Sequence, residues 1–330
     1  MEEWTWPPPT KSSPFTALPT SKTQNLAKPQ FQYPIRFLHV TAETPDGVFS
    51  ALPDDILTRI AASFSHPNLK SASLVCRSWR DSLLPLRQAM LFLRWGKSFK
   101  HGRAGVRPNV DKALDSFLKG AALGSTLAMV DAGLLYWEIG DKVKAVEMYE
   151  RAALLGDASA MCNLGISFLQ EPKRPQEAVK WLAMASKSGN MRAQYQLALC
   201  LHRGCGLDRN LGEAARWYLK AAEGGYIRAM YNVALCYSFG EGFRQNRHRA
   251  RSWMKRAADA GHSKAQYEHG LNLFSQGDMT KAGVYLELAT RAGERAAIHV
   301  KNVILQQLSV PSRDRVMFLA DSWRTSPSIR

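Results

Sequence analysis

Small apolar residues recur in a fixed pattern over most of the chain. Six times, a pair of small residues is followed after two further positions by a glycine: Gly124, Gly156, Gly189, Gly225, Gly261 and Gly293. Four residues after each glycine stands an alanine: Ala128, Ala160, Ala193, Ala229, Ala265 and Ala297. Seven residues before each small pair stands another: Ala113, Ala145, Ala178, Ala214, Ala250 and Ala282. This period of 32–36 residues predicts a solenoid of stacked helix pairs.

Each unit is predicted to consist of helix A, a loop, helix B and the glycine. The glycine ends helix B because it adopts positive φ at little cost. An aromatic residue follows the helix B alanine by three or four positions and fills the space beside it: Phe117, Tyr149, Trp181, Trp217, Trp253 and Tyr285. A short polar residue four positions before that alanine is expected to cap helix B: Asn109, Asp141, Asn210, Asn246 and Asp278. In the remaining unit Arg174 stands there, followed by Pro175, a favoured first helical residue.

The units differ in length only between helix A and helix B. The two longest loops, residues 204–210 and 240–246, both begin with Gly-x-Gly and end with asparagine. Insertions confined to one loop leave the stacking surfaces intact, which is typical of a solenoid. Gly105 and Asn109 stand at equivalent positions before Ala113, so a first helix A is expected before residue 105.

A different pattern precedes the repeats. After Leu52-Pro53, the apolar residues Ile56, Leu57 and Ile60 predict one face of a short helix. Val75-Cys76-Arg77-Ser78-Trp79 follows a second apolar stretch around Leu69. These residues predict a small three-helix module, with an N-terminal cap of the solenoid as the alternative. No obvious linker separates it from the repeats, so its last helix is expected to run into the first repeat.

Residues 1–48 are rich in Pro, Ser and Thr and show no helical or strand periodicity. Disorder is therefore predicted for them. A transit peptide is the alternative, because residues 4–42 contain no acidic side chain, although Glu2 and Glu3 argue against it. The start of the chain lacks the basic and apolar segments of a secretion signal.

The net charge of +16 comes entirely from residues after 50, because residues 1–50 carry four basic and four acidic side chains. Two basic runs stand out, around Arg94–Arg107 and Arg244–Arg256. Basic runs can mark a nucleic-acid site, an acidic partner or an import signal, or simply a solvated helix face. Solvation is the simplest interpretation of both runs.

The sequence contains no recognisable catalytic or metal-binding motif. The five cysteines are odd in number and scattered without a CxxC pair, which favours reduced thiols. Cys200 and Cys205 flank His202, but helix packing explains them better than a thiol site. No stretch is long and apolar enough for a membrane helix. No cofactor, metal or catalytic activity is therefore expected, and the chain is expected in the cytoplasm or nucleus, with a plastid or mitochondrion as the lesser alternative.

The repeats resemble the Sel-one-like repeats, which are related to tetratricopeptide repeats. Ala193-Gln-Tyr-Gln-Leu-Ala198 and Ala229-Met-Tyr-Asn-Val-Ala234 are among the closest matches to the family pattern, which extends over about residues 90–308. The resemblance implies an all-α chain with a right-handed α/α solenoid of about six repeats, whose concave surface binds proteins or peptides.

Residues 49–92 resemble an F-box, with Asp55 where the family usually has Glu. The resemblance implies that Leu52, Pro53, Ile56, Leu57 and Ile60 contact a Skp-type adaptor. It assigns Val75, Cys76 and Trp79 partly to the module core and partly to the adaptor contact. The predicted organisation is then residues 1–48 disordered, 49–92 F-box, 93–308 solenoid, and 309–330 a tail or a degenerate capping helix.

A client-binding groove is predicted from two rows on helix A. Tyrosines stand two residues after the helix A alanine and cations one residue before it: Arg192, Tyr195, Arg228, Tyr231, Lys264 and Tyr267. If the geometry of tetratricopeptide repeats applies, both rows line the inner wall. Tyrosine provides contact area, and a cation provides charge-assisted hydrogen bonds. The alternative is that these residues only pack the repeats.

Taken together, these features predict the substrate-recognition subunit of an SCF-type cullin–RING ubiquitin ligase. A Skp-type adaptor, and through it cullin and RING subunits, would bind the F-box, and a protein client would bind the repeats. The alternatives are a scaffold that does not direct degradation and, less favoured, a nucleic-acid-binding repeat protein.

Overall fold

The computed structural model describes residues 53–61, 64, 66–103, 105–170 and 174–323. The chain divides into two compact units, residues 1–45 and residues 46–330, and every described residue belongs to the second. The described part contains seventeen α-helices and no strand, which confirms the all-α prediction. The expected disorder of residues 1–48, the alternative transit peptide and Leu52 lie outside the described residues.

Three short helices and one long helix form the N-terminal part. They are α1 (Asp54–Ala61), α2 (His66–Ala72), α3 (Arg77–Ser82) and α4 (Leu84–His101). The buried residues Leu86, Met90 and Leu93 continue one apolar face along α4, with no helix-ending residue between them. The predicted boundary at residue 92 therefore falls inside a continuous helix. This helix runs without a break from residue 84 into the region where the repeats are expected.

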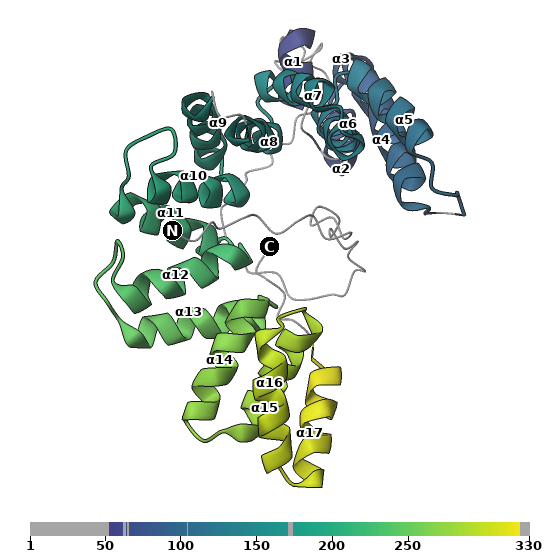
Figure 1. Ribbon diagram of the computed structural model, residues 1–330. Helices are drawn as coiled ribbons and strands as arrows, with labels where there is room; N and C mark the ends of the chain where they lie inside the picture. Colours follow the sequence, from purple (N-terminus) through teal and green to yellow (C-terminus); the bar gives the residue numbers. More distant parts are fainter. Residues whose placement is uncertain (1–52, 62–63, 65, 104, 171–173, 324–330) are drawn as a thin grey trace, which may run out of the picture. The chain divides into compact units, whose positions relative to one another are not determined.

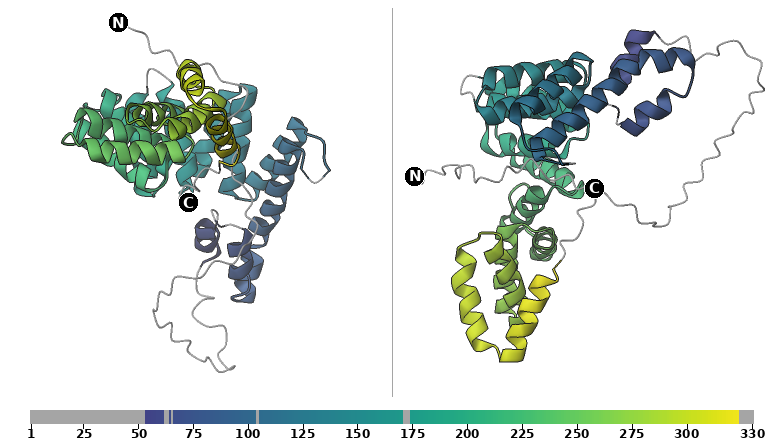
Figure 2. Two further views of the ribbon diagram at one scale, coloured as in Figure 1. Left: turned by 90° about the horizontal axis from the view of Figure 1, so that it is seen from below. Right: turned by 90° about the vertical axis from the view of Figure 1, so that its right-hand side faces the viewer.

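The repeats follow as helix pairs, each packed against the next along the chain (Figures 1 and 2). The pairs are α4–α5, α6–α7, α8–α9, α10–α11, α12–α13 and α14–α15. Their bounds are α5 (Val110–Ala122), α6 (Thr126–Ile139), α7 (Lys142–Leu154), α8 (Ala158–Leu169), α9 (Pro175–Lys187), α10 (Met191–Arg203), α11 (Leu211–Glu223), α12 (Ile227–Phe239), α13 (Arg247–Asp259), α14 (Ser263–Ser275) and α15 (Met279–Arg291). Two further helices, α16 (Ala296–Gln307) and α17 (Val310–Asp321), complete the described chain.

The predicted packing residues occupy the core. All twelve repeat alanines are buried, which brings neighbouring helices close together. The six glycines that end the second helix of each pair have φ between +86° and +95°. Residues other than glycine rarely adopt this backbone conformation, so the helix ends predicted from the glycines are confirmed.

The predicted helix caps are also present. The side chains of Asn109, Asp141, Asn210, Asn246 and Asp278 each accept a hydrogen bond from the backbone N–H three residues later. Arg174 makes no such cap, and Pro175 begins α9 as expected.

The two long loops pack against the preceding repeat. Gly206 lies against the backbone of Pro175 at the start of α9, and Gly242 lies against the carbonyl of Leu211 at the start of α11. Both glycines have positive φ, and a Cβ at either position would overlap with that neighbouring backbone. The Gly-x-Gly sequence is thus required by close contact between repeats as well as by the turn itself.

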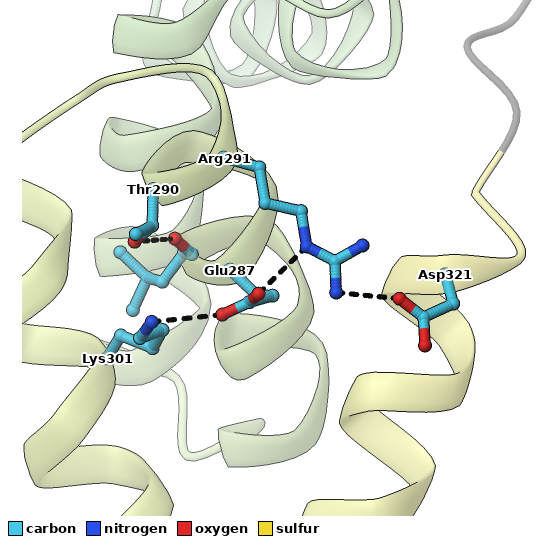
Figure 3. Close-up of polar contacts among 6 residues, drawn as sticks. Glu287, Thr290, Arg291, Lys301 and Asp321 are labelled. Atoms are coloured by element: carbon cyan, nitrogen blue, oxygen red, sulfur yellow. Dashed lines mark hydrogen bonds and ion pairs between the residues drawn. The ribbon is translucent and has the colours of Figure 1, made fainter.

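The last two helices close the array through a buried carboxylate (Figure 3). Glu287 on α15 pairs with Arg291 (Oε1···Nε 2.8 Å) and with Lys301 on α16 (Oε2···Nζ 3.0 Å). Arg291 also pairs with Asp321 on α17 (2.7 Å). Burial alone would raise the pKa of Glu287, but the hydrogen bonds from Arg291 and Lys301 outweigh it and hold the pKa below its usual range. Within residues 309–330, for which a tail or a degenerate capping helix is expected, residues 310–321 form α17.

Candidate protein-binding surfaces

Helix α1 carries two apolar ridges that face in different directions. Leu57 and Ala61 are buried in the core, with Leu57 only 3% exposed. Ile56 and Ile60, also one helical turn apart, are 42% and 53% exposed. An exposed pair of isoleucines on such a short helix is an unfavourable surface unless a partner covers it.

Of the other residues predicted to contact the adaptor, some pack inside the module and some lie on its surface. The Cys76 thiol caps α3 by accepting a hydrogen bond from the Trp79 backbone N–H (3.4 Å), and Trp79 packs against the core. Val75 is 48% exposed, and Pro53 is exposed as well. Ser82 at the end of α3 donates to the Asp54 carboxylate at the start of α1 (2.5 Å), which ties these two helices together. Ile56, Ile60, Val75 and Pro53 are thus available to a partner, whereas Leu57 supports them from inside the module.

The three predicted cations of the client row are not equivalent. Arg228 and Lys264, at the starts of α12 and α14, are exposed. Arg192, at the start of α10, is half-buried and donates to the Asn163 side chain on α8 (2.9 Å). The structure therefore leaves two of these cations open to solvent, while the third contacts the preceding repeat.

The three predicted tyrosines are half-buried packing residues. The Tyr195 ring lies 5.7 Å from the ring of Tyr218 and 5.0 Å from that of Tyr226, and burial raises its pKa. Tyr267 packs against a separate core cluster at the C-terminal end of the repeats. These rings present only part of their area to a client.

Tyr231 belongs to a polar cluster that the sequence did not reveal. Its hydroxyl donates to the Glu268 carboxylate (2.6 Å), and its ring stacks on the imidazole of His262 at 4.6 Å. Glu268 lies 37 positions further along the chain, in the next repeat, so the pairing follows from repeat stacking. Burial and the Glu268 carboxylate both raise the pKa of Tyr231.

His262 has a structural role at this cluster. Its Nδ1 accepts a hydrogen bond from the backbone N–H of Ala265 (3.2 Å), and it therefore caps α14. Asn190 occupies the equivalent position at α10 and accepts from Ala193 (2.9 Å). Burial, together with the nearby charges of Arg228 and Lys264, lowers the pKa of His262 to about 4. The capping interaction requires the neutral imidazole.

We expect His262→Asn to remove a pH dependence of stability. The imidazole has a pKa of about 4 in the folded chain against the usual 6.5, so the unfolded state binds the proton first as the pH falls. The free energy of unfolding should drop by about 2–3 kcal/mol between roughly pH 6.5 and pH 4. Asparagine should still cap α14, because Asn190 caps α10 in the same way. Since asparagine does not titrate, the free energy of unfolding of the variant should change less between pH 6.5 and pH 4. Urea unfolding at several pH values measures the difference, and identical pH profiles would contradict the assignment.

Three of the five cysteines are buried thiols. Burial raises the pKa of Cys162 and Cys236 to about 11 and that of Cys200 to about 12, so these thiols stay protonated at neutral pH. The His202 imidazole lies 3.4 Å from the Glu241 carboxylate. Among the described residues, no group of three or more His, Cys, Asp or Glu is placed to hold a metal ion. None of the described helices has the length and apolar character to cross a membrane.

Comparison with known families identifies both parts of the chain. The Sel1 repeat family matches residues 93–125, 129–157, 158–190, 192–226, 227–262 and 263–294. The F-box-like family matches residues 49–84. The matched repeats end before α16, so α16 and α17 extend the array beyond the family pattern.

Individual proteins agree with these matches. An F-box protein of Arabidopsis thaliana is 66% identical over 289 residues, which are 86% of this chain and 82% of that protein. DAP3-binding cell death enhancer 1 of Mus musculus is 36% identical over 74 residues, which are 22% of this chain and 14% of that protein. The crystal structure of a Sel1 repeat protein from Oxalobacter formigenes is 25% identical, with a TM-score of 0.55, and the match covers 72% of this chain and 97% of that one. The chain therefore belongs to the Sel1 repeat family and carries an F-box-like domain in front of its six repeats.

Proposed function

We propose that this protein is the substrate-recognition subunit of an SCF-type cullin–RING ubiquitin ligase. The observation that carries the proposal is the exposed isoleucine ridge of α1, Ile56 and Ile60, within an F-box-like domain. This ridge, with Val75 and Pro53, is the surface that a Skp-type adaptor would cover. Burial of a few apolar side chains at the centre of a small interface provides most of its binding energy.

Helix α4 determines how the two parts would work together. This helix begins at residue 84, where the F-box-like match ends, and runs into the first repeat, which begins at residue 93, so a client held by the repeats would be kept at a defined distance from the adaptor. In this role the chain transfers no group itself. It raises the effective concentration of the client's lysines near the ubiquitin-carrying enzyme.

We place the client on the first helices of the repeats. These helices contact one another from α4 through α10, as expected for the inner layer of a curved array. Arg228 on α12 and Lys264 on α14 are exposed cations at the starts of two further first helices, and Tyr195, Tyr231 and Tyr267 provide partly exposed rings on these helices and on α10. Such a surface favours an acidic or phosphorylated client segment.

Co-purification of full-length components tests the proposal. The chain is expressed with a Skp-type adaptor, cullin and RING subunit, and all four should elute as one complex. Proteins captured by the repeats should then receive ubiquitin when the charged enzyme is added. Failure of the adaptor to co-purify would overturn the proposal. A complex that holds its captured proteins but leaves them unmodified would favour the alternative of a scaffold that does not direct degradation.

Reversing the exposed cations should weaken client binding. We expect Arg228→Glu together with Lys264→Glu to reduce client capture by about tenfold, because attraction of an acidic segment becomes repulsion. Adaptor binding and melting temperature should stay unchanged, since both side chains are exposed. Arg151→Glu with Lys187→Glu, on α7 and α9, makes the same change in net charge as a control. Quantitative affinity purification compares the variants, and equal capture by both pairs would show that Arg228 and Lys264 are only solvated.

A further inference from the structure

The two basic runs have different surroundings. In the first, Lys97 pairs with Asp131 (3.2 Å) and Lys100 with Glu138 (2.8 Å), so α6 neutralises part of the charge of α4. In the second, residues 240–259 contain six basic side chains and two acidic ones. Only Lys255 of these six forms an ion pair with another described residue, Asp259 (2.9 Å). The loop before α13 and the outward face of α13 therefore carry a positive charge that the described chain leaves uncompensated.

Aromatic rings hold two of the guanidinium groups in place. Arg249 lies over the Tyr237 ring (5.6 Å to the centroid) and donates to the Tyr237 hydroxyl (3.3 Å). Arg256 lies over the Trp253 ring at 4.0 Å. A guanidinium held against a ring keeps most of its five N–H donors free while its side chain is restrained. Less entropy is then lost when an anion binds to either group.

A surface hollow of about 420 Å³ is lined by Arg249 and by Trp253, the residue whose ring Arg256 covers. Its lining residues belong to α11, α12 and α13, the helices labelled so in Figure 1, and Leu219, Tyr237 and Trp253 give it apolar walls. Arg249, Ser252 and Glu223 supply polar groups at the same hollow. The hollow thus combines space for an apolar side chain with cations next to it.

We propose that the α13 surface, defined by Arg249, Arg256 and this hollow, binds an acidic segment of another protein and receives one of its apolar side chains. Carboxylates of that segment would contact the two restrained guanidiniums. A leucine-sized side chain would enter between Leu219 and Trp253. This surface is separate from the cations Arg228 and Lys264 and does not depend on adaptor binding.

Neither terminal segment of the chain carries a net negative charge. Residues 1–50 contain four acidic and four basic side chains, and residues 324–330 contain none that is acidic. A nucleic acid fits less well than a protein segment, because the aromatic rings of this surface are already engaged. Arg256 covers Trp253, and Tyr237 is stacked on Phe243 at 4.8 Å, so neither ring is open where bases would need to stack.

Fluorescence anisotropy with the full-length purified chain tests the proposal. The probe is a short labelled peptide of glutamates and aspartates around one leucine, compared with the same peptide carrying alanine instead and with a single-stranded RNA of equal charge. The variant Arg249→Glu with Arg256→Glu should bind the leucine peptide at least about tenfold more weakly. Both arginines are exposed, and glutamate at residue 249 suits the first turn of α13, so this variant should fold. Arg151→Glu with Lys187→Glu again controls for net charge and should bind as the wild type does.

A second variant, Ser252→Phe, tests the hollow without changing the charge. The phenylalanine should fill the hollow, so this variant should bind the leucine peptide about tenfold more weakly than the wild type does. Its affinity for the leucine peptide should then equal the affinity of the wild type for the alanine peptide. The proposal is wrong if the arginine variant and the control bind the leucine peptide equally, or if leucine and alanine peptides bind the wild type equally. It is also wrong if the RNA binds more tightly than the leucine peptide, since the surface would then be a nucleic-acid site.

Discussion

Replacing Gly242 by alanine should lower the free energy of unfolding by about 3 kcal/mol or more. Gly242 has φ +75°, which costs an alanine about 1–2 kcal/mol. In addition, the new Cβ would overlap with the Leu211 carbonyl at the start of α11. This carbonyl belongs to the backbone of a packed helix and cannot rotate away, so the whole loop would have to move off the preceding repeat. Urea unfolding followed by circular dichroism measures the loss.

Gly277→Ala provides the matched control for the steric part. Gly277 also has positive φ (+83°), but an added Cβ would meet no atom within 4 Å. This variant should therefore lose only about 1 kcal/mol, which corresponds to the backbone conformation alone. Equal losses for the two variants would mean that the long loop is not fixed against α11.

Replacing Ile56 and Ile60 by aspartate should reduce adaptor affinity by at least about a hundredfold. This change places two carboxylates where the proposed interface needs two buried apolar side chains, and burying unpaired charges is strongly unfavourable. Both isoleucines are exposed in the free chain, so its melting temperature should hardly change. Isothermal titration calorimetry with a purified Skp-type adaptor measures the affinity.

Val143→Asp is the control for introducing a charge at an exposed apolar residue. Val143 lies on α7 and is 71% exposed, and α7 belongs to the repeats and not to the F-box-like domain. Adaptor affinity should be unaffected by this substitution. If the α1 variant retained full affinity, the adaptor could not cover this ridge, and the functional proposal would lose its main support.

The features that could be predicted from the sequence are those set by local chemistry. A glycine that ends a helix and an asparagine that caps one are recognisable from their position in the repeat, and the structure confirms both. Four of the first helices have side-chain caps as well, but their chemistry varies from Ser125 and Asp157 to Asn190 and His262. Only their common position, directly after the glycine, would have identified His262 as a cap.

Contacts between repeats could not be predicted in the same way. The hydrogen bond from Arg192 to Asn163 and that from Tyr231 to Glu268 join residues 29 and 37 positions apart. Their formation depends on how one helix pair rotates on the next, and periodicity does not encode that angle. The same holds for Leu57, since a run of apolar residues on α1 does not say which ridge faces the core.

The long loops give the array a direction during synthesis. Gly206 contacts residue 175 and Gly242 contacts residue 211, so both loops pack on a segment that leaves the ribosome earlier. Each repeat can dock onto a completed neighbour as soon as its own loop emerges, and these contacts require nothing that is still to be translated. The growing chain can therefore fold from its N-terminal side, and at each stage the apolar surface of the newest helix pair stays exposed until the next pair packs on it.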